Sequence, residues 1–353
     1  MRTDAAIMDY CLALAARGAG QVSPNPLVGA AVVRDHCVVS AGWHERYGGP
    51  HAEVNALRNG FPADATLYVT LEPCCHHGKT PPCTDLLLRR GVRRAVIGMR
   101  DPHAKVAGKG LAQLRRAGVQ LTVGVRERDC RALNRSFCTH ITTGRPFVIL
   151  KAGLTLDGAI APANGRRTVI TSAAARADAA RFRATVDAII VGRGTAAADN
   201  PRLTVRGVRG ARAPWRIVMD TCGSLSPRLR LFTDGAAPTL WVTGPAAQLP
   251  PSPHYEQLRL PLDRAGHPDL QALLAELGRR GRGQVMVEGG GTLNAAFLRT
   301  GLVDACRLYL APRALGGKRV PWLAESAPGI VWREWSLTRH NDYALFTGWR
   351  ERA

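Results

Sequence analysis

A histidine, a glutamate and two cysteines have the types and spacing of a zinc site with a proton carrier beside it. His51 and Glu53 belong to the run His-Ala-Glu, Cys74 follows a proline, and Cys83 comes eight intervening residues later. Zinc prefers imidazole and thiolate ligands, and a catalytic zinc keeps three protein ligands so that water can occupy the fourth position. We therefore predict that His51, Cys74 and Cys83 are the metal ligands.

Glu53 supplies the proton carrier that a hydrolytic reaction at zinc needs. Zinc lowers the pKa of a bound water toward neutrality, which prepares the water for attack on a carbon that carries an amino group. A carboxylate beside the metal can carry the proton of that water to the substrate ring and the departing ammonia. Zinc nucleobase deaminases share the pattern H-x-E followed by P-C and another cysteine. In this chain the two cysteines are further apart than in that pattern.

A closed structural zinc site is the alternative interpretation. It needs a fourth ligand, for which Cys75, His76 and His77 are available in the sequence. A structural site explains neither Glu53 nor its spacing from His51. The catalytic interpretation is therefore preferred, and the three extra candidates are expected to be loop residues.

Longer motifs surround the predicted zinc site. Residues 23–29 read SPNPLVG, residues 71–74 read LEPC, and residues 76–83 read HHGKTPPC. With the His-Ala-Glu run, these segments resemble the bifunctional riboflavin-biosynthesis deaminase/reductase family. The long spacing between the cysteines, with HHGKTPP inside it, separates that family from cytidine, tRNA-adenosine and guanine deaminases. The resemblance implies a cytidine-deaminase-like three-layer sandwich for this half of the chain.

The resemblance also implies the contacts of the deaminase substrate. Asn25 and His44 would face its pyrimidine or ribityl region, and Lys79 and Thr80 would engage its phosphate. A loop cation beside the metal suits an anionic substrate. The alternative for Lys79 is an ordinary solvated lysine.

The second half of the chain contains motifs that are similar to the reductase half of the same family, which has a dihydrofolate-reductase-like fold and uses NADPH. These motifs are K-x-x-x-T-x-D-G at 151–158, I-T-S at 170–172, V-G-x-x-T-x-x-x-D-N-P-x-L-T-x-R at 191–206 and E-G-G-G at 288–291. The NADPH site implied by the resemblance is lined by Gly153, Thr171, Thr195, Asp199, Gly290, Gly291, Thr292, Leu293 and Asn294. The implied contacts of the phosphorylated substrate are Arg183, Leu203, Arg206 and Glu288.

Two of these features have a physical interpretation of their own. The glycine run at 289–291, after a predicted strand and before a predicted helix, lets backbone N–H groups approach a phosphate, although it could also be a plain tight turn. It is not the G-x-G-x-x-G fingerprint of dinucleotide-binding folds. Paired arginines bind phosphate through charge-assisted, bidentate hydrogen bonds, whereas isolated surface arginines serve solubility.

The chain departs from the family pattern at four positions. His103 and Ala104 stand where the family more often has asparagine and proline, and Arg167 and Val169 stand where a small hydroxyl residue and a tryptophan precede the I-T-S run. The missing aromatic ring removes an expected packing surface in the reductase half.

Composition limits the class of protein. The 353 residues are enough for two domains, and 46% hydrophobic with 21% charged residues is typical of globular proteins. The net charge of +21 would suit nucleic-acid binding, but the arginines are scattered and aromatic residues make up only 6%. We therefore favour phosphorylated small molecules as partners. The resemblance also implies that the protein assembles as a homo-oligomer.

The nine cysteines show no disulfide pattern, which indicates a reducing, cytoplasmic location. The first residues have the pattern of an amphipathic helix, not of a signal peptide. No apolar run approaches the roughly 20 residues that a membrane helix needs.

Local patterns place the motifs on an α/β framework. Helices are expected at 4–17, from His51 onward, 84–91, 172–184, 268–280 and 292–299, with Thr84 and Asp85 as helix caps. Strands are expected at 28–34, 37–43, 67–71, 94–99, 147–158, 187–192, 215–220, 284–291 and 305–312. The turn-rich segment at 142–146 predicts a domain boundary, with a zinc-dependent pyrimidine deaminase at 1–144 and an NADPH-dependent reductase at 145–353.

The resemblance therefore implies a bifunctional enzyme of riboflavin biosynthesis. It would deaminate 2,5-diamino-6-ribosylamino-4(3H)-pyrimidinone 5′-phosphate and then reduce the ribosyl group to ribityl. The alternatives are a deaminase whose reductase half has drifted, a nucleic-acid base deaminase, and a noncatalytic protein, which would require a damaged zinc site.

Overall fold

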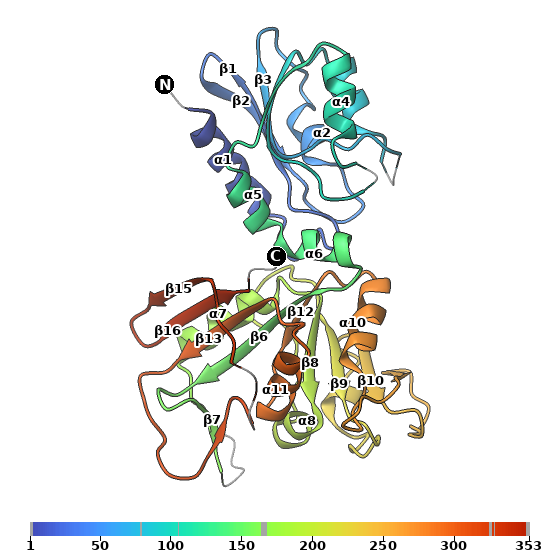
Figure 1. Cartoon of the computed structure of the whole chain (residues 1–353), viewed down its shortest axis with the longest axis vertical. Coiled ribbons are helices and arrows are strands. Elements are labelled where there is room, and N and C mark those ends of the chain that lie inside the picture. The colour runs from blue at the N-terminus through green and yellow to red at the C-terminus, as the bar shows by residue number, and fades with distance from the viewer. Residues whose placement is uncertain are drawn as a thin grey trace. The chain divides into compact units, whose positions relative to one another are not determined.

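The computed structural model describes residues 3–77, 80–104, 106–163, 168–324, 327 and 329–350. The chain divides into two compact units, Met1–Gly144 and Arg145–Ala353 (Figure 1). Within the described residues, no helix has both the length and the apolar character needed to cross a membrane.

The first unit is built on a five-stranded sheet with the strand order β2-β1-β3-β4-β5. Its strands are β1 (Gly29–Arg34), β2 (Cys37–Trp43), β3 (Thr66–Leu71), β4 (Arg94–Met99) and β5 (Gln120–Val123). β1 runs antiparallel to β2 and β3, whereas β3, β4 and β5 are parallel. The three central strands are buried along nearly their whole length, as expected for a sheet covered on both faces.

Helices form the outer layers of this unit. They are α1 (Asp4–Ala16), α2 (Ala52–Ala56), α3 (Cys83–Arg89), α4 (Lys109–Arg116), α5 (Glu127–Leu133) and α6 (Arg135–Thr143). Figure 1 shows α1 and α5 on one side of the sheet and α2 and α4 on the other. The predicted α/β three-layer sandwich is confirmed. The strands expected at 28–34, 37–43, 67–71 and 94–99 are also present to within one residue.

The predicted caps of α3 are wrong. The residue at the N-cap is Pro82, whose side chain makes no capping hydrogen bond. The Thr84 hydroxyl donates a hydrogen bond to Gln113 on α4 (3.0 Å), and Gln113 in turn donates to Asp85 (3.0 Å). Both residues therefore join two helices, because a side-chain partner on α4 competes with the local backbone.

The second unit contains a nine-stranded sheet with the order β11-β10-β9-β8-β12-β6-β13-β16-β15. The strands are β6 (Phe147–Leu154), β8 (Ala188–Gly192), β9 (Trp215–Met219), β10 (Thr239–Thr243), β11 (Glu256–Arg259), β12 (Gln284–Val287), β13 (Ala305–Leu310), β15 (Glu334–Arg339) and β16 (Ala344–Trp349). All pairings are parallel except β13 with β16 and β16 with β15. A separate pair is formed by β7 (Ala159–Pro162) and β14 (Arg319–Pro321).

Both faces of this sheet are covered, as predicted. The helices are α7 (Ala173–Arg183), α8 (Arg193–Asp199), α9 (Arg230–Thr233), α10 (Leu270–Arg279) and α11 (Gly291–Arg299). Side chains alternate along β8: Ile190 packs in the cluster that contains α10 and α11, whereas Ile189 and Val191 pack with α8 and α9. The sequence prediction did not include α8, α9, β10, β11, β15 or β16.

Candidate active site

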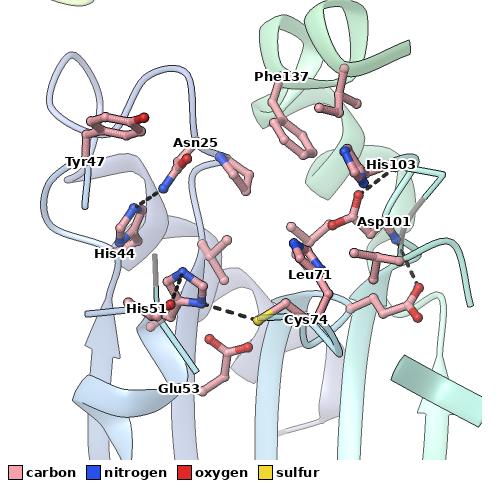
Figure 2. A pocket seen from close by; sticks show the side chains of 18 of the residues that line it. Asn25, His44, Tyr47, His51, Glu53, Leu71, Cys74, Asp101, His103 and Phe137 are labelled. Atoms are coloured by element: carbon pink, nitrogen blue, oxygen red, sulfur yellow. Dashed lines mark hydrogen bonds between the residues drawn. The ribbon is translucent and has the colours of Figure 1, made fainter. Parts of the chain in front are cut away.

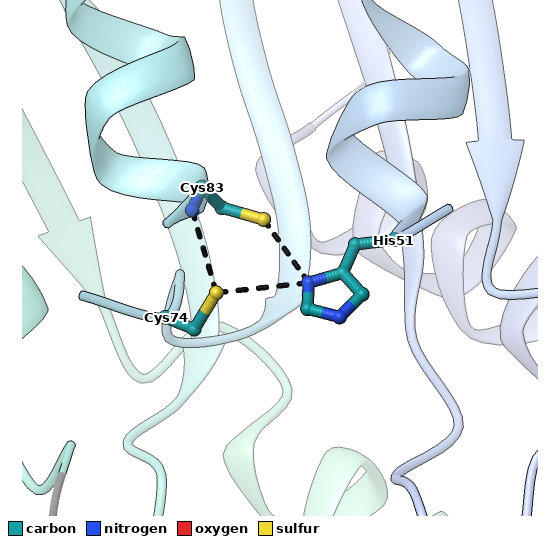
Figure 3. Close-up of side chains that lie close together, drawn as sticks. All are labelled: His51, Cys74 and Cys83. Atoms are coloured by element: carbon teal, nitrogen blue, oxygen red, sulfur yellow. Dashed lines mark hydrogen bonds between the residues drawn. The ribbon is translucent and has the colours of Figure 1, made fainter. Parts of the chain in front are cut away.

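Three segments of the first unit bring the predicted zinc ligands together. His51 is the residue before α2, Cys83 is the first residue of α3, and Cys74 lies in the loop after β3. The Nδ1 atom of His51 lies 3.2 Å from Sγ of Cys83 and 3.6 Å from Sγ of Cys74. Figure 3 shows this ring nitrogen directed at the two sulfurs. The three ligand atoms lie within 4.8 Å of one another, which suits one tetrahedral zinc with an open position.

The surroundings of Cys74 favour the thiolate form of its side chain. The backbone N–H of Cys83 donates to Sγ of Cys74 at 3.3 Å. A hydrogen bond from the Cys83 side chain, followed by the interaction with His51, lowers the pKa of Cys74. A thiolate is the form of cysteine that binds metals. The pocket therefore favours the ligating form of Cys74.

Glu53 lies in the first turn of α2 and is 4% exposed. Burial raises the pKa of its carboxyl group above the usual range, and the charge of Cys74 acts in the same direction. A raised pKa lets a carboxyl group hold a proton more readily than an exposed carboxyl group does, as a proton carrier requires. Its position and its environment suit a proton carrier.

Two of the predicted metal ligands, His51 and Cys74, line a cavity of about 290 Å³. In Figure 2, Asn25, His44 and Tyr47 form one wall, and Asp101, His103 and Phe137 form the other. The floor is made by His51, Glu53 and Cys74. The cavity combines polar side chains in its walls with two predicted metal ligands at its floor, which suits a polar heterocycle.

Asn25 and His44 are held in one arrangement. His44 Nδ1 lies 2.9 Å from the carbonyl oxygen of Pro50, and its Nε2 lies 3.0 Å from Nδ2 of Asn25. Because the carbonyl can only accept, His44 donates through Nδ1 and accepts from Asn25 through Nε2. Burial, with a smaller contribution from His51, lowers the pKa of His44, which keeps the ring neutral. The predicted pair thus forms an ordered wall.

Two other predicted contacts have different outcomes. Thr80 lines the cavity, and its hydroxyl lies 3.2 Å from Nε2 of His51. Lys79 lies outside the described residues, as does Arg167. The alternative ligands Cys75, His76 and His77 do not belong to the metal-binding cluster found among the described residues.

Sequence reasoning missed the residue that supports the second wall. Glu72 is buried, and its carboxylate accepts hydrogen bonds from the backbone N–H groups of Asp101 (3.2 Å), Gly108 (3.0 Å) and Leu111 (3.2 Å). The Asp101 carboxylate in turn accepts from the N–H of His103 at 2.8 Å. Glu72 is part of the LEPC segment, but nothing in that pattern indicates contacts with a loop 29 or more residues away.

A second group of charges lies in the other unit. Glu288 follows β12, Arg183 ends α7, and Lys151 lies on β6. Arg183 donates to both carboxylate oxygens of Glu288 at 2.8 and 2.9 Å, and Lys151 lies 3.6 Å from the same carboxylate. Burial alone would raise the pKa of Glu288, but the charges of Lys151 and Arg183 outweigh it and lower the pKa. Arg183 and Glu288 were predicted as site residues, and Lys151 was not.

Four of the residues predicted for the nucleotide site lie close together in two pairs, Gly290 with Thr195 and Gly153 with Thr171. Gly290 is the N-cap of α11, and a side chain at Gly290 would first meet the Thr195 hydroxyl, at 3.7 Å. A Cβ atom at Gly153 would lie 2.7 Å from the methyl group of Thr171. The open space at Gly290 and the helix N-terminus suit a phosphate group of a nucleotide.

Two other predicted residues, Asn294 and Leu203, are buried, so their side chains have less direct access to a ligand. The Asn294 side chain is buried and donates to the carbonyl oxygens of Gly289 (3.3 Å) and Trp322 (3.0 Å). Leu203 is 4% exposed and packs in the core, with a backbone φ of 51°. Any contact from Leu203 to a substrate would therefore come from its backbone.

The predicted site residues Asp199, Arg206 and Thr292 are exposed. Val169, which stands in place of the tryptophan of the family, is exposed as well.

The chain matches two family models. Residues 1–99 match the cytidine and deoxycytidylate deaminase zinc-binding region, and residues 146–343 match the RibD C-terminal domain. A riboflavin biosynthesis protein RibD from Bacillus amyloliquefaciens is 40% identical over 323 residues, which are 90% of this chain and 86% of that protein. The RibD of Escherichia coli strain K12 is also 40% identical, covering 88% of each chain.

Solved structures agree with these sequence matches. The diaminohydroxyphosphoribosylaminopyrimidine deaminase/5-amino-6-(5-phosphoribosylamino)uracil reductase of Thermotoga maritima superposes with a TM-score of 0.86 at 34% identity, over 98% of both chains. Acinetobacter baumannii RibD superposes with a TM-score of 0.86 at 32% identity, over 99% of both chains. The chain therefore belongs to the RibD family of bifunctional riboflavin-biosynthesis enzymes, which join a zinc-binding deaminase region to a reductase domain.

Proposed function

We propose that residues 1–144 deaminate 2,5-diamino-6-ribosylamino-4(3H)-pyrimidinone 5′-phosphate, and that residues 145–353 then reduce the ribosyl group of the product to ribityl with NADPH. The observation that carries the first step is the convergence of His51, Cys74 and Cys83 in one cluster, of which His51 and Cys74 line a cavity together with Glu53. The similarity to the Thermotoga maritima enzyme supports this choice of substrates.

In the deamination, His51, Cys74 and Cys83 would hold zinc. Zinc, when bound, makes water reactive enough to attack the carbon that carries the 2-amino group. Glu53 would carry one proton of the water to the ring nitrogen and then the second proton to the amino group, which leaves as ammonia. One water is consumed, one ammonia leaves, and the ring carbon becomes a carbonyl.

The walls of the cavity would position the substrate. Asn25 and His44 would face the pyrimidine or ribityl region, because their mutual hydrogen bond holds them in one wall of the cavity. Lys79 and Thr80 would bind the phosphate, for which a cation and a hydroxyl are suitable partners. Zinc and these side chains together would place the amino-bearing carbon over Glu53.

In the reduction, NADPH supplies the hydride. Its site would be formed by residues that include the pairs Gly153 with Thr171 and Gly290 with Thr195. The other proposed residues of this site are Asp199, Gly291, Thr292, Leu293 and Asn294. Asn294 would act indirectly, because its amide group holds the carbonyl of Gly289.

The reductase substrate would be bound by Arg183, Arg206 and Glu288, with the backbone of Leu203. The ion pair between Arg183 and Glu288 places a guanidinium and a carboxylate side by side. The carboxylate of such a pair can accept hydrogen bonds from substrate hydroxyl groups with defined geometry. A homo-oligomeric state and a cytoplasmic location stay predictions.

The proposal is tested by following NADPH oxidation with the diaminopyrimidine phosphate as the sole substrate, in the wild type and in Glu53→Gln. We expect oxidation by the wild type, none by the variant, and recovery by the variant when the deaminated substrate is supplied. Ammonia release without NADPH oxidation would refute the reductase half, and absence of both signals would refute the proposed substrate.

A further inference from the structure

We propose that Thr80 is a positioning residue for the metal ligand His51: its hydroxyl accepts a hydrogen bond from Nε2–H of the imidazole. This bond would hold the ring in the tautomer and orientation that present Nδ1 to zinc. The inference rests on the proposed zinc site and deepens it, because it assigns to Thr80 a role beyond contact with the substrate.

The two nitrogens of the His51 ring have different partners. Nδ1 lies 3.2 and 3.6 Å from the sulfurs of Cys83 and Cys74. Nε2 lies 3.2 Å from Oγ1 of Thr80. A neutral imidazole that binds a metal through the lone pair of Nδ1 carries its hydrogen on Nε2. Nε2 then needs an acceptor, and the hydroxyl oxygen of Thr80 is placed to be that acceptor.

The neighbouring ring of His44 does not accept the hydrogen bond from Nε2–H of His51. His44 packs against His51 edge-to-face, with ring centroids 5.5 Å apart. The polar atoms of His44 are engaged elsewhere, with Pro50 and Asn25. Metal-binding histidines usually donate their second ring N–H to a nearby acceptor, which fixes the ring and raises its basicity. Thr80 therefore completes the arrangement that a zinc-binding histidine normally has.

The contact between Thr80 and His51 depends on the length of the loop between the two cysteines. Thr80 lies within the long segment between Cys74 and Cys83, and the backbone of α3 begins soon after it. A loop of only two residues between the cysteines would not contain such a residue. We infer that the extended loop supplies a partner for the histidine as well as residues that face the substrate.

The same hydroxyl can serve the substrate at the same time. A threonine hydroxyl has one O–H donor and two acceptor lone pairs. Accepting from His51 leaves the O–H free to donate to an oxygen of the substrate in the cavity, which Thr80 lines. Substrate contact and metal-ligand orientation would therefore meet in one side chain.

Zinc affinity tests this role without relying on enzyme activity. We would measure the zinc dissociation constant of the full-length apoprotein by competition with a chromophoric chelator. Thr80→Val removes the hydroxyl at nearly constant volume, and Thr80→Ser keeps it. Thr122→Val, at an exposed position of β5, is the matched control for the loss of a threonine hydroxyl.

We expect Thr80→Val to bind zinc about 10–100-fold more weakly, as is typical when the partner of a ligating histidine is lost. Thr80→Ser and Thr122→Val should bind within about threefold of the wild type on the same scale. Unchanged affinity in Thr80→Val would overturn the proposal, as would an equal loss in Thr80→Ser, which would indicate packing by the methyl group. Failure of the wild type to bind one zinc would instead remove the proposed metal site itself.

Discussion

Nδ1 of His51 and Sγ of Cys83 lie 3.2 Å apart, although 32 positions separate the two residues in the chain. Each stands at the N-terminal end of a helix, α2 or α3, and these two helices pack against each other. The contact therefore depends on the packing of regular elements and not on a flexible loop. Sites built on such elements hold their geometry well.

Glu53→Gln should abolish most of the deamination and leave the zinc site intact. The amide keeps the size of the side chain but cannot carry protons, a function worth about 10²–10⁴-fold in rate. Ammonia release from the diaminopyrimidine phosphate measures the effect. Zinc content and NADPH oxidation with the deaminated substrate are the controls, and a variant with wild-type ammonia release would exclude Glu53 as the proton carrier.

Removal of zinc should stop the first reaction and spare the second. Cys74→Ala leaves two of the three ligands found in the cluster, so we expect loss of bound zinc and of ammonia release. NADPH oxidation with the deaminated substrate should continue at the wild-type rate, because the ligands all lie in the first unit. Cys37→Ala, at an exposed cysteine of the same unit, is the matched control. Retention of stoichiometric zinc in Cys74→Ala would contradict the ligand assignment.

Arg183→Met should shift the pH dependence of the reduction. In the wild type, Lys151 and Arg183 overcome the effect of burial and lower the pKa of Glu288. The ionised carboxylate therefore stabilises the folded state above its ordinary pKa, and this contribution is lost as the pH falls through the lowered pKa. Without Arg183 the pKa of Glu288 rises, so the acidic limb of the kcat/KM profile should move to higher pH.

The control for this shift is Arg181→Met, because Arg181 lies on the same helix, is 64% exposed and pairs with Asp178. It removes the same charge from α7 without a contact to Glu288. An acidic limb that stays in place in Arg183→Met, or moves equally in both variants, would show that the ion pair does not control Glu288.

Glu72→Ala should destabilise the first unit and weaken substrate binding there. The carboxylate accepts backbone hydrogen bonds from Asp101, in the loop after β4, and from Gly108 and Leu111 at the start of α4. Hydrogen bonds to charged groups contribute about 1.5–3 kcal/mol each, so we expect a loss of about 3 kcal/mol or more in the free energy of unfolding. Denaturant unfolding and the KM for ammonia release provide the two measurements.

Glu127→Ala is the comparison for that variant. Glu127 forms an exposed ion pair with Arg131 one helical turn away, and such pairs contribute only about 0.3–0.5 kcal/mol. Equal destabilisation by the two substitutions would mean that Glu72 does not anchor the loop.

The cluster of His51, Cys74 and Cys83 and the main strands could be predicted from the sequence because their signals are local. The spacing of His51 and Glu53 and the position of Cys74 follow from chemistry that few residue types can perform. The central strands are short apolar runs, and they were predicted to within one residue in the first unit. Shorter or partly exposed elements such as β11 and β15 lack that signal and were missed.

Contacts between distant segments required the tertiary structure. Thr84 and Asp85 have the residue types of helix caps, yet both bind Gln113 on another helix. The pairing of Glu72 with the loop after β4, of Lys151 with Glu288, and of Thr80 with His51 likewise joins segments that are not adjacent in the chain. A local pattern records which side chains are available, whereas their partners depend on how helices and strands pack, and a side chain takes the partner that packing brings within hydrogen-bond distance.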